Sequence, residues 1–213
     1  MSDSRNPTSW LLLGLLTVVG VGGAVLGVAQ SPKNVPLQQA VDNTLAAPNY
    51  SEVLTESTAQ GKQTDYLTYQ APDRLGGYIQ SGSKRTYVYV IGALEFQSLT
   101  VSANSPNPHL VFYKQSSQGA KALDPAHGYL PYARQGKNIQ QSGGTYSFTL
   151  TKSGQTGKFG FTVSGQYISE FTLNVQSASV QLVISEVGTS LPVRLPAGSK
   201  VVAAPSGSAG NAG

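Results

Sequence analysis

Two histidines and a few carboxylates are the side chains in this sequence that could do acid–base or metal chemistry. His127 follows Asp124 by three residues, which could supply half of a catalytic triad or of a metal pair, and His109 stands apart. A triad also needs a nucleophile on a strained turn, but the sequence has no Gly-x-Ser-x-Gly motif. A metal site needs further ligands, whereas the acidic residues are dispersed and cysteine is absent. We therefore predict no catalytic residue, no metal and no cofactor.

Two other patterns invite the same test. Glu52 and Glu56 are four residues apart in a candidate strand, but glycoside hydrolysis needs carboxylates that face each other across a cleft of about 5–10 Å. We interpret them as solvated charges on the polar face of a sheet. The glycine-rich segments 81–84 and 143–144 are not followed by the start of a helix, which a phosphate-binding loop needs. They are interpreted as hairpin turns.

The charge distribution limits the classes of partner that the protein can bind. The formal net charge is +4, but only 11% of the residues are charged and the basic ones are scattered. A nucleic-acid-binding protein normally has a denser basic stripe, so we predict no nucleic-acid partner. A mild positive excess is compatible with an anionic membrane surface.

The longest apolar run covers residues 10–29 and contains no charge. About 20 apolar residues are enough to cross a bilayer core as a helix. Two interpretations remain. We predict a single-pass signal-anchor in the cell membrane, with residues 1–9 cytoplasmic and everything after a linker at 30–36 extracytoplasmic. The alternative is a signal peptide that is cleaved near Ala29, which would release the protein as a secreted one.

The remaining sequence predicts one short helix and then a β-domain. Residues 37–46 place four apolar side chains at spacings of three and four, and Pro48 ends this helix. From residue 51 the apolar pattern has period two, and glycine-containing turns separate the segments, which indicates an antiparallel meander with one polar face. The candidate strands are 51–59, 63–70, 75–81, 84–91, 94–101, 109–115, 145–152, 157–164, 166–175 and 178–187.

A second short helix is predicted over 125–134, because Asp124 can cap it and Pro125 suits its first position. The residues from 203 to 213 are predicted to be disordered. Such a sheet has an apolar face that few helices can cover, so it must curl around them or on itself.

The aromatic residues of the sheet form the strongest constellation. They could be ordinary packed core, or they could line a cavity for a lipid or another apolar ligand. The candidate ligand-binding residues are Tyr87, Tyr89, Phe96, Phe148, Phe159, Phe161, Phe171 and Leu182.

The order of elements is similar to that of a known family. Residues 66–74 read as a strand that closes on a Pro-Asp-Arg turn, 87–92 as an aromatic strand that ends in glycine, and 192–196 as Pro-Val-Arg-Leu-Pro. Over about residues 36–202, this resembles the LolA-like superfamily and its LppX/LprG-type bacterial lipoproteins. The resemblance implies an unclosed antiparallel half-barrel wrapped around helices, with an apolar cavity that carries acyl chains and no catalytic residue. The family's lipidated cysteine is missing here.

The resulting prediction is a mainly β (α+β) domain over 37–202, with a large curved antiparallel sheet or half-barrel on one to three short helices, preceded by one transmembrane helix. Its predicted function is to bind or shuttle an apolar, lipidic ligand at the outer face of the membrane, without enzymatic activity. The alternative is an anchored interaction, sensor or envelope-assembly module with a closed core. The sequence names neither a protein partner nor the ligand.

Overall fold

The computed structural model describes residues 35–105, 110–152 and 154–204. Its first element is helix α2 (Val35–Ala46), which buries Leu37, Ala40 and Val41 as the sequence predicts. Thr44 bonds back to the Ala40 carbonyl oxygen at 2.7 Å and accepts a bond from the backbone of Ile168 at 2.9 Å. The helix is therefore fixed to the sheet by a buried polar contact as well as by apolar packing.

The first half of the sheet is a meander that follows α2. The turns after β3 and β4 carry Gly82 and Gly92 with positive φ, where the absence of a side chain permits a tight hairpin. Its strands are β1 (Asn49–Thr58), β2 (Gly61–Gln70), β3 (Arg74–Ser81), β4 (Lys84–Ile91), β5 (Leu94–Ser98), β6 (Val101–Ser102) and β7 (Val111–Ser116).

A layer of three short helical elements connects this half to the second. They are α3 (Ala120–Leu123), α4 (Pro125–Tyr129) and the 3-10 helix η2 (Leu130–Gln135). Asp124 caps α4 by accepting a bond from the backbone N–H of His127, and Pro125 occupies the first turn, which confirms the predicted start. The predicted helix over 125–134 is thus divided into α4 and η2.

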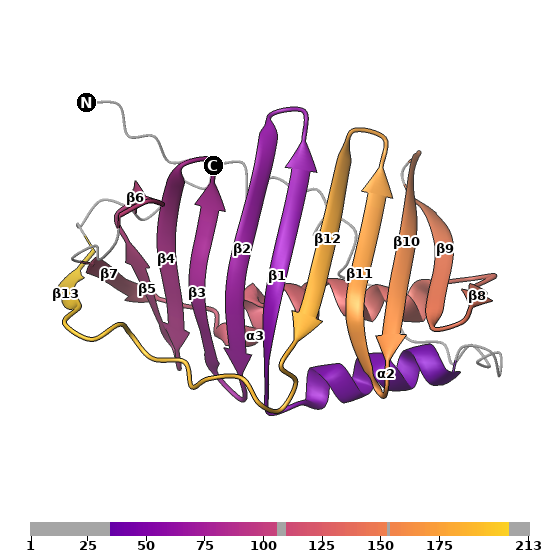
Figure 1. Ribbon diagram of the computed structural model, residues 1–213, viewed down its shortest axis with the longest axis horizontal. Coiled ribbons are helices and arrows are strands. Elements are labelled where there is room, and N and C mark those ends of the chain that lie inside the picture. Colours follow the sequence, from indigo (N-terminus) through magenta and orange to yellow (C-terminus); the bar gives the residue numbers. More distant parts are fainter. Residues whose placement is uncertain (1–34, 106–109, 153, 205–213) are drawn as a thin grey trace.

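The second half is a meander of five strands. These are β8 (Gln140–Ser142), β9 (Thr145–Lys152), β10 (Gln155–Ser164), β11 (Tyr167–Val175) and β12 (Ala178–Ser185). After β12 the segment 186–199, yellow in Figure 1, runs past the lower ends of the first-half strands to a last strand, β13 (Lys200–Ala203).

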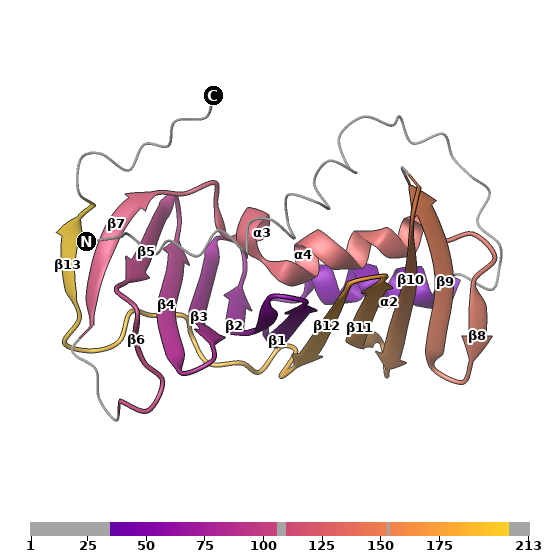
Figure 2. The same ribbon diagram turned by 90° about the horizontal axis from the view of Figure 1, so that it is seen from above.

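One open sheet joins the two halves. Its strand order is β13-β7-β5-β4-β3-β2-β1-β12-β11-β10-β9-β8, and β6 pairs with β4. The pairing of β1 with β12, with Leu54 opposite Leu182, connects the meanders. All pairs are antiparallel except that of β13 with β7. The sheet curves, and the helices lie on its concave side (Figures 1 and 2). The predicted large, curved, open sheet on a few short helices is confirmed.

We call this side the helix-covered face and the opposite side the outer face. Because side chains alternate along a strand, each strand contributes to both. The main core lies on the helix-covered face and includes side chains from α2, α3, α4, η2 and from strands of both meanders.

The structure also differs from the sequence prediction in several places. The predicted strand 94–101 is interrupted after Ser98, the strand predicted to reach 187 ends at Ser185, and β8, β13 and α3 were not predicted. The predicted membrane helix at 10–29 lies outside the described residues, as does nearly all of the predicted tail. Among the residues that the structure describes, no helix is long and apolar enough to span a membrane.

Candidate functional site

An aromatic cluster fills the space between the second half of the sheet and the helices. Phe148 stacks on Phe159 with ring centroids 5.2 Å apart, and it lies 5.8 Å from Phe161. Phe161 meets Phe171 edge-on at 5.1 Å, and Phe171 stacks under Tyr129 of α4 at 5.3 Å. All five side chains are at most 5% exposed. The cluster therefore runs continuously from strand β9 to the helix layer.

Strand register explains why these rings meet. Phe161 is opposite Tyr146 on β9 and Phe171 on β11, and Phe171 is opposite Leu182 on β12. Residues that face each other across antiparallel strands share a face, so the period-two pattern of each strand aligns into one apolar row. Leu182 is fully buried in it.

The other three predicted lining residues lie elsewhere. Tyr87, Tyr89 and Phe96 belong to a second cluster that also contains Leu110 and Phe112. Tyr89 alternates with Val90, which belongs to the main core, so the second cluster lies on the outer face. The structure thus brings Phe148, Phe159, Phe161, Phe171 and Leu182 together and separates Tyr87, Tyr89 and Phe96 from them. That any of them line a ligand cavity stays a prediction.

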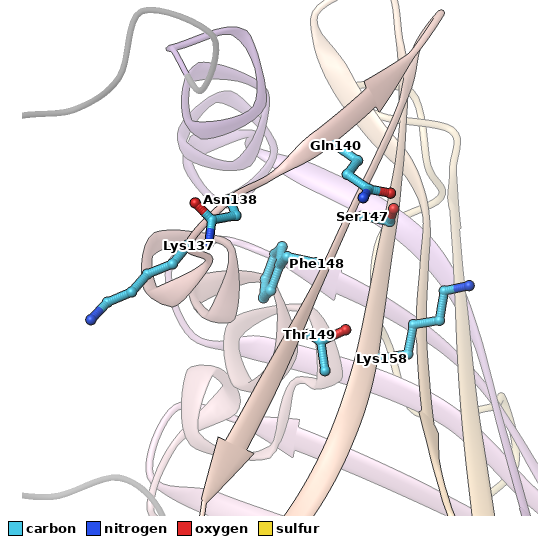
Figure 3. A pocket seen from close by; sticks show the side chains of 7 residues that line it. All are labelled: Lys137, Asn138, Gln140, Ser147, Phe148, Thr149 and Lys158. Carbon is cyan, nitrogen blue, oxygen red and sulfur yellow. The ribbon is translucent and has the colours of Figure 1, made fainter.

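A hollow of about 280 Å³ opens at the β8–β9 end of the sheet (Figure 3). It lies where β9 passes beyond its pairing with β8, which ends at Ser147 opposite Gln140. Phe148 is the buried aromatic side chain of its lining, so the hollow meets the end of the aromatic cluster. Its lining residues are Lys137, Asn138, Gln140, Ser147, Phe148, Thr149 and Lys158.

A buried polar cluster lies on the same helix-covered face, between β1 and α4. The Asp124 carboxylate, 2% exposed, accepts bonds on Oδ2 from the Tyr50 hydroxyl at 2.6 Å and from the His127 backbone at 2.9 Å. The Nδ1 of His127 lies 2.5 Å from the same oxygen. Glu52, 1% exposed, accepts a bond from the backbone N–H of Ala126 at 3.3 Å.

These contacts change the acid–base properties of the cluster. Burial raises the pKa of Glu52 well above its ordinary value, and the nearby Asp124 charge raises it further. Burial and the same carboxylate raise the pKa of the Tyr50 hydroxyl, which favours a neutral hydrogen-bond donor over a phenolate nucleophile. Among the described residues, no group of three or more His, Asp or Glu side chains is placed to hold a metal ion. The arrangement can hold and transfer a proton.

A second polar contact lies four residues further along β1, at Glu56. The Tyr129 hydroxyl of α4 donates to Glu56 Oε1 at 3.2 Å. Burial raises the pKa of Glu56, and the bond from Tyr129 partly opposes that shift. Burial also raises the pKa of neighbouring Asp65 on β2 to about 7. Strand β1 therefore holds the helix layer through carboxyl groups at two points.

The interpretation of Glu52 and Glu56 as solvated charges is wrong. Along β1, residues 50, 52, 54 and 56 are all buried. The two glutamates thus share the phase of Tyr50 and Leu54, and they lie under α4. The sequence contained a signal for this burial: Glu52 and Glu56 alternate in step with the apolar residues of β1. In a strand, residues that alternate in step lie on the same face. The shared phase outweighs the usual expectation that glutamate is exposed.

Replacing Tyr129 with phenylalanine should lower the free energy of unfolding by about 1–3 kcal/mol, because Glu56 loses its bond and stays buried. Urea denaturation at neutral pH measures this. Tyr132→Phe is the matched control, since that tyrosine is only partly buried against the same core. Equal effects of the two substitutions would contradict a role for the Tyr129–Glu56 bond.

Comparisons with known proteins support the fold. No protein-family model matches this sequence, and no curated protein sequence matches it either. The crystal structure of the Mycobacterium tuberculosis lipoprotein LppX superposes with a TM-score of 0.50 at 13% identity, over 78% of this chain and 100% of LppX. The structure of LprF from Mycobacterium bovis gives a TM-score of 0.48 at 13% identity, over 79% of this chain and 98% of LprF.

At such low identity, the likeness to LppX concerns the fold alone. The superposition extends over all of LppX, so it concerns the domain as a whole and not a single motif. The described part of this chain therefore has a fold similar to that of LppX, in agreement with the expected open, half-barrel-like sheet.

Proposed function

We propose that this β-domain binds the acyl chain of a lipid between the helix-covered face and the helix layer, and that it carries the lipid without chemical change. The observation that carries the proposal is the aromatic cluster, which runs without interruption from the hollow at Phe148 to Tyr129 of α4. Apolar and aromatic side chains of this kind are the usual lining of sites for apolar ligands, although the hollow itself is lined by polar residues apart from Phe148. The LppX-type fold is compatible with this use.

The proposed place of action is the outer face of the cell membrane. The uncharged run at 10–29 supports this location, either as an uncleaved anchor or as a signal that is removed near Ala29. An anchor would keep the domain within the reach of a short linker at 30–36. Cleavage would produce a carrier that diffuses freely.

The hollow supports a particular route of entry. Phe148, Lys137 and Lys158 all belong to its lining, and the two lysine side chains extend in opposite directions from it (Figure 3). An acyl chain that displaces the Phe148 ring would reach Phe159 and Phe161 directly. Either lysine of the lining could then attract an anionic head group at the polar end of the lipid.

Photolabelling tests this proposal. The full-length chain is incorporated into vesicles whose phospholipids carry a photoactivatable group on the acyl chain, and labelled residues are mapped by mass spectrometry after irradiation. We expect label on helix-covered residues of β9, β10 and β11. Phe148→Ala should increase that label several-fold because it removes the ring at the entrance, whereas Thr149→Ala, at the same hollow, should not.

Label confined to residues 10–29, with none on the helix-covered face in either variant, would contradict lipid binding by the domain. Circular dichroism of each variant verifies that it is folded before the label is compared.

A second candidate function rests on a different observation. The five side chains of the aromatic cluster are each at most 5% exposed, which equally suits a closed core. In that case the domain would act as an anchored interaction, sensor or envelope-assembly module. The same experiment separates the two, because a closed core remains unlabelled even in Phe148→Ala.

A further inference from the structure

Two carboxyl groups from different layers of the fold meet in the interior. Glu52 comes from β1, and Asp124 is the residue that caps α4. Asp124 Oδ2 already has donors from Tyr50 and His127, and Glu52 Oε2 has the Ala126 backbone. One oxygen of each group remains, Glu52 Oε1 and Asp124 Oδ1, and both are buried without a protein donor.

A single proton on one carboxyl group would give both remaining oxygens a hydrogen-bond partner. Both carboxyl groups bind the first turn of α4, Glu52 through the Ala126 N–H and Asp124 through the His127 N–H, so they lie close together. A hydrogen bond between them requires that one of them is protonated. Glu52 is the group that holds the proton, because three donors converge on Asp124 Oδ2 whereas Glu52 has a single backbone donor. Without that proton, two buried carboxylates would repel each other across the junction of β1 and α4.

The surroundings of Glu52 do not favour its charged form. On its own strand the neighbouring titratable group is Tyr50, and from β2 the nearby groups are Asp65 and Tyr69. Strand β12 places apolar Ile184 opposite Glu52. From α4 come Asp124 and His127, and the imidazole of His127 is engaged with Asp124. Losing the proton would therefore place a second negative charge beside Asp124 in a low-dielectric interior.

We propose that the proton shared by Glu52 and Asp124 is a latch that holds α4 against β1, and that its loss lets the helix layer move away from the helix-covered face. The helix layer closes the aromatic cluster through Tyr129, which stacks on Phe171. Opening the latch would expose that cluster. The consequence for a lipid, namely that raised pH admits or releases it, rests on the proposed function; the latch itself does not.

The direction of the pH dependence follows from the raised pKa of Glu52. A carboxyl group whose pKa is raised by folding stabilises the native state fully below its ordinary pKa, and this contribution is lost as pH rises through the folded value. Glu56 and Asp65 shift in the same direction. Variants are therefore needed to separate the contribution of Glu52.

Hydrogen exchange of the full-length chain tests the latch. Protection of residues 125–135, corrected for the intrinsic pH dependence of exchange, is followed from pH 5 to pH 9. We expect it to fall with a limiting slope of about tenfold per pH unit, as for one titrating proton, while β11 stays protected. In Glu52→Gln the amide replaces the carboxylic acid as a permanent donor to Asp124, so most of the fall should disappear and only the smaller contributions of Glu56 and Asp65 should remain.

Matched controls are Glu56→Gln and Asp65→Asn, which alter the other two nearby carboxyl groups of raised pKa and should keep most of the wild-type fall. A flat wild-type profile would overturn the latch, and so would a fall in Glu52→Gln as steep as in wild type. If Glu52→Gln does not fold, the wild-type profile with the two controls still decides: a fall that either control abolishes assigns the effect to that residue instead.

The effect of the latch on lipid access is measured separately. Photolabelling of the helix-covered face should be several-fold greater at pH 9 than at pH 5 in wild type and unchanged in Glu52→Gln. One outcome would be protection that depends on pH but no label at either pH. It would support the latch and contradict the proposed lipid binding. Label that is equal at both pH values contradicts control of access by the latch.

Discussion

Replacing Phe161 with alanine is expected to lower the free energy of unfolding by about 3–5 kcal/mol, the range for removing a buried phenylalanine. Its side chain is 1% exposed and contacts Phe148 and Phe171 at ring separations of 5.8 and 5.1 Å. Alanine would leave a cavity in the middle of that cluster, where rings on three strands and a helix constrain each other. The surroundings can collapse only partly around such a void.

Urea denaturation of the full-length chain measures this loss, and Thr162→Ala is the matched control. Thr162 is the next residue on β10 and belongs to the opposite face, so its substitution should cost much less. The two interpretations of the aromatic cluster give different results. A packed core loses stability, whereas a ring that lines a ligand space would lose binding of an apolar dye while stability changes by less than about 1 kcal/mol.

The second large effect is expected at Gly77 on β3. A Cβ atom built there would lie 1.9 Å from the backbone carbonyl oxygen of Tyr66 on β2, and Gly77 has φ of 157°. The obstruction is backbone in a paired strand, so it cannot be relieved by rotating a side chain. Gly77→Ala should cost about 2–6 kcal/mol, which adds overpacking and backbone strain of about 1–3 kcal/mol each.

Thermal or urea unfolding checks the expectation, with Gly128→Ala as the control. Gly128 lies in α4 with open space around its Cα, so alanine there should leave stability unchanged or raise it by up to about 1 kcal/mol. Similar stabilities for the two variants would show that β2 and β3 can separate at Gly77 without cost.

Local sequence was sufficient to predict most of the sheet. Strands β4 and β9 have the bounds that alternation predicted, and Gly82, Gly92 and Gly165 adopt the positive φ that their turns require. Alternating apolar residues and glycine turns act over a few residues, so they are legible without knowledge of the fold. For the same reason, Asp124 and Pro125 were sufficient to predict where α4 begins.

Which face of a strand is buried could not be predicted in the first half of the sheet. The aromatic side chains Tyr89 and Phe96 looked like partners of Phe161, but they lie on the outer face. They are covered there by the segment 186–199, whose Val193 would contact a Cβ atom at Gly76 and whose Leu195 packs on the second cluster. That segment is almost one hundred residues away in sequence.

The sequence by itself determined most of the strands and their turns, the start of α4 and the amphipathic α2, because these depend on interactions between near neighbours. Only the tertiary structure decided that β1 pairs with β12 and that α4 lies over β1. That arrangement buries Glu52 against Asp124 and makes a proton the link between two layers. Burial and proximity to a second charge are properties of the assembled fold, and they turn an ordinary glutamate into the candidate latch.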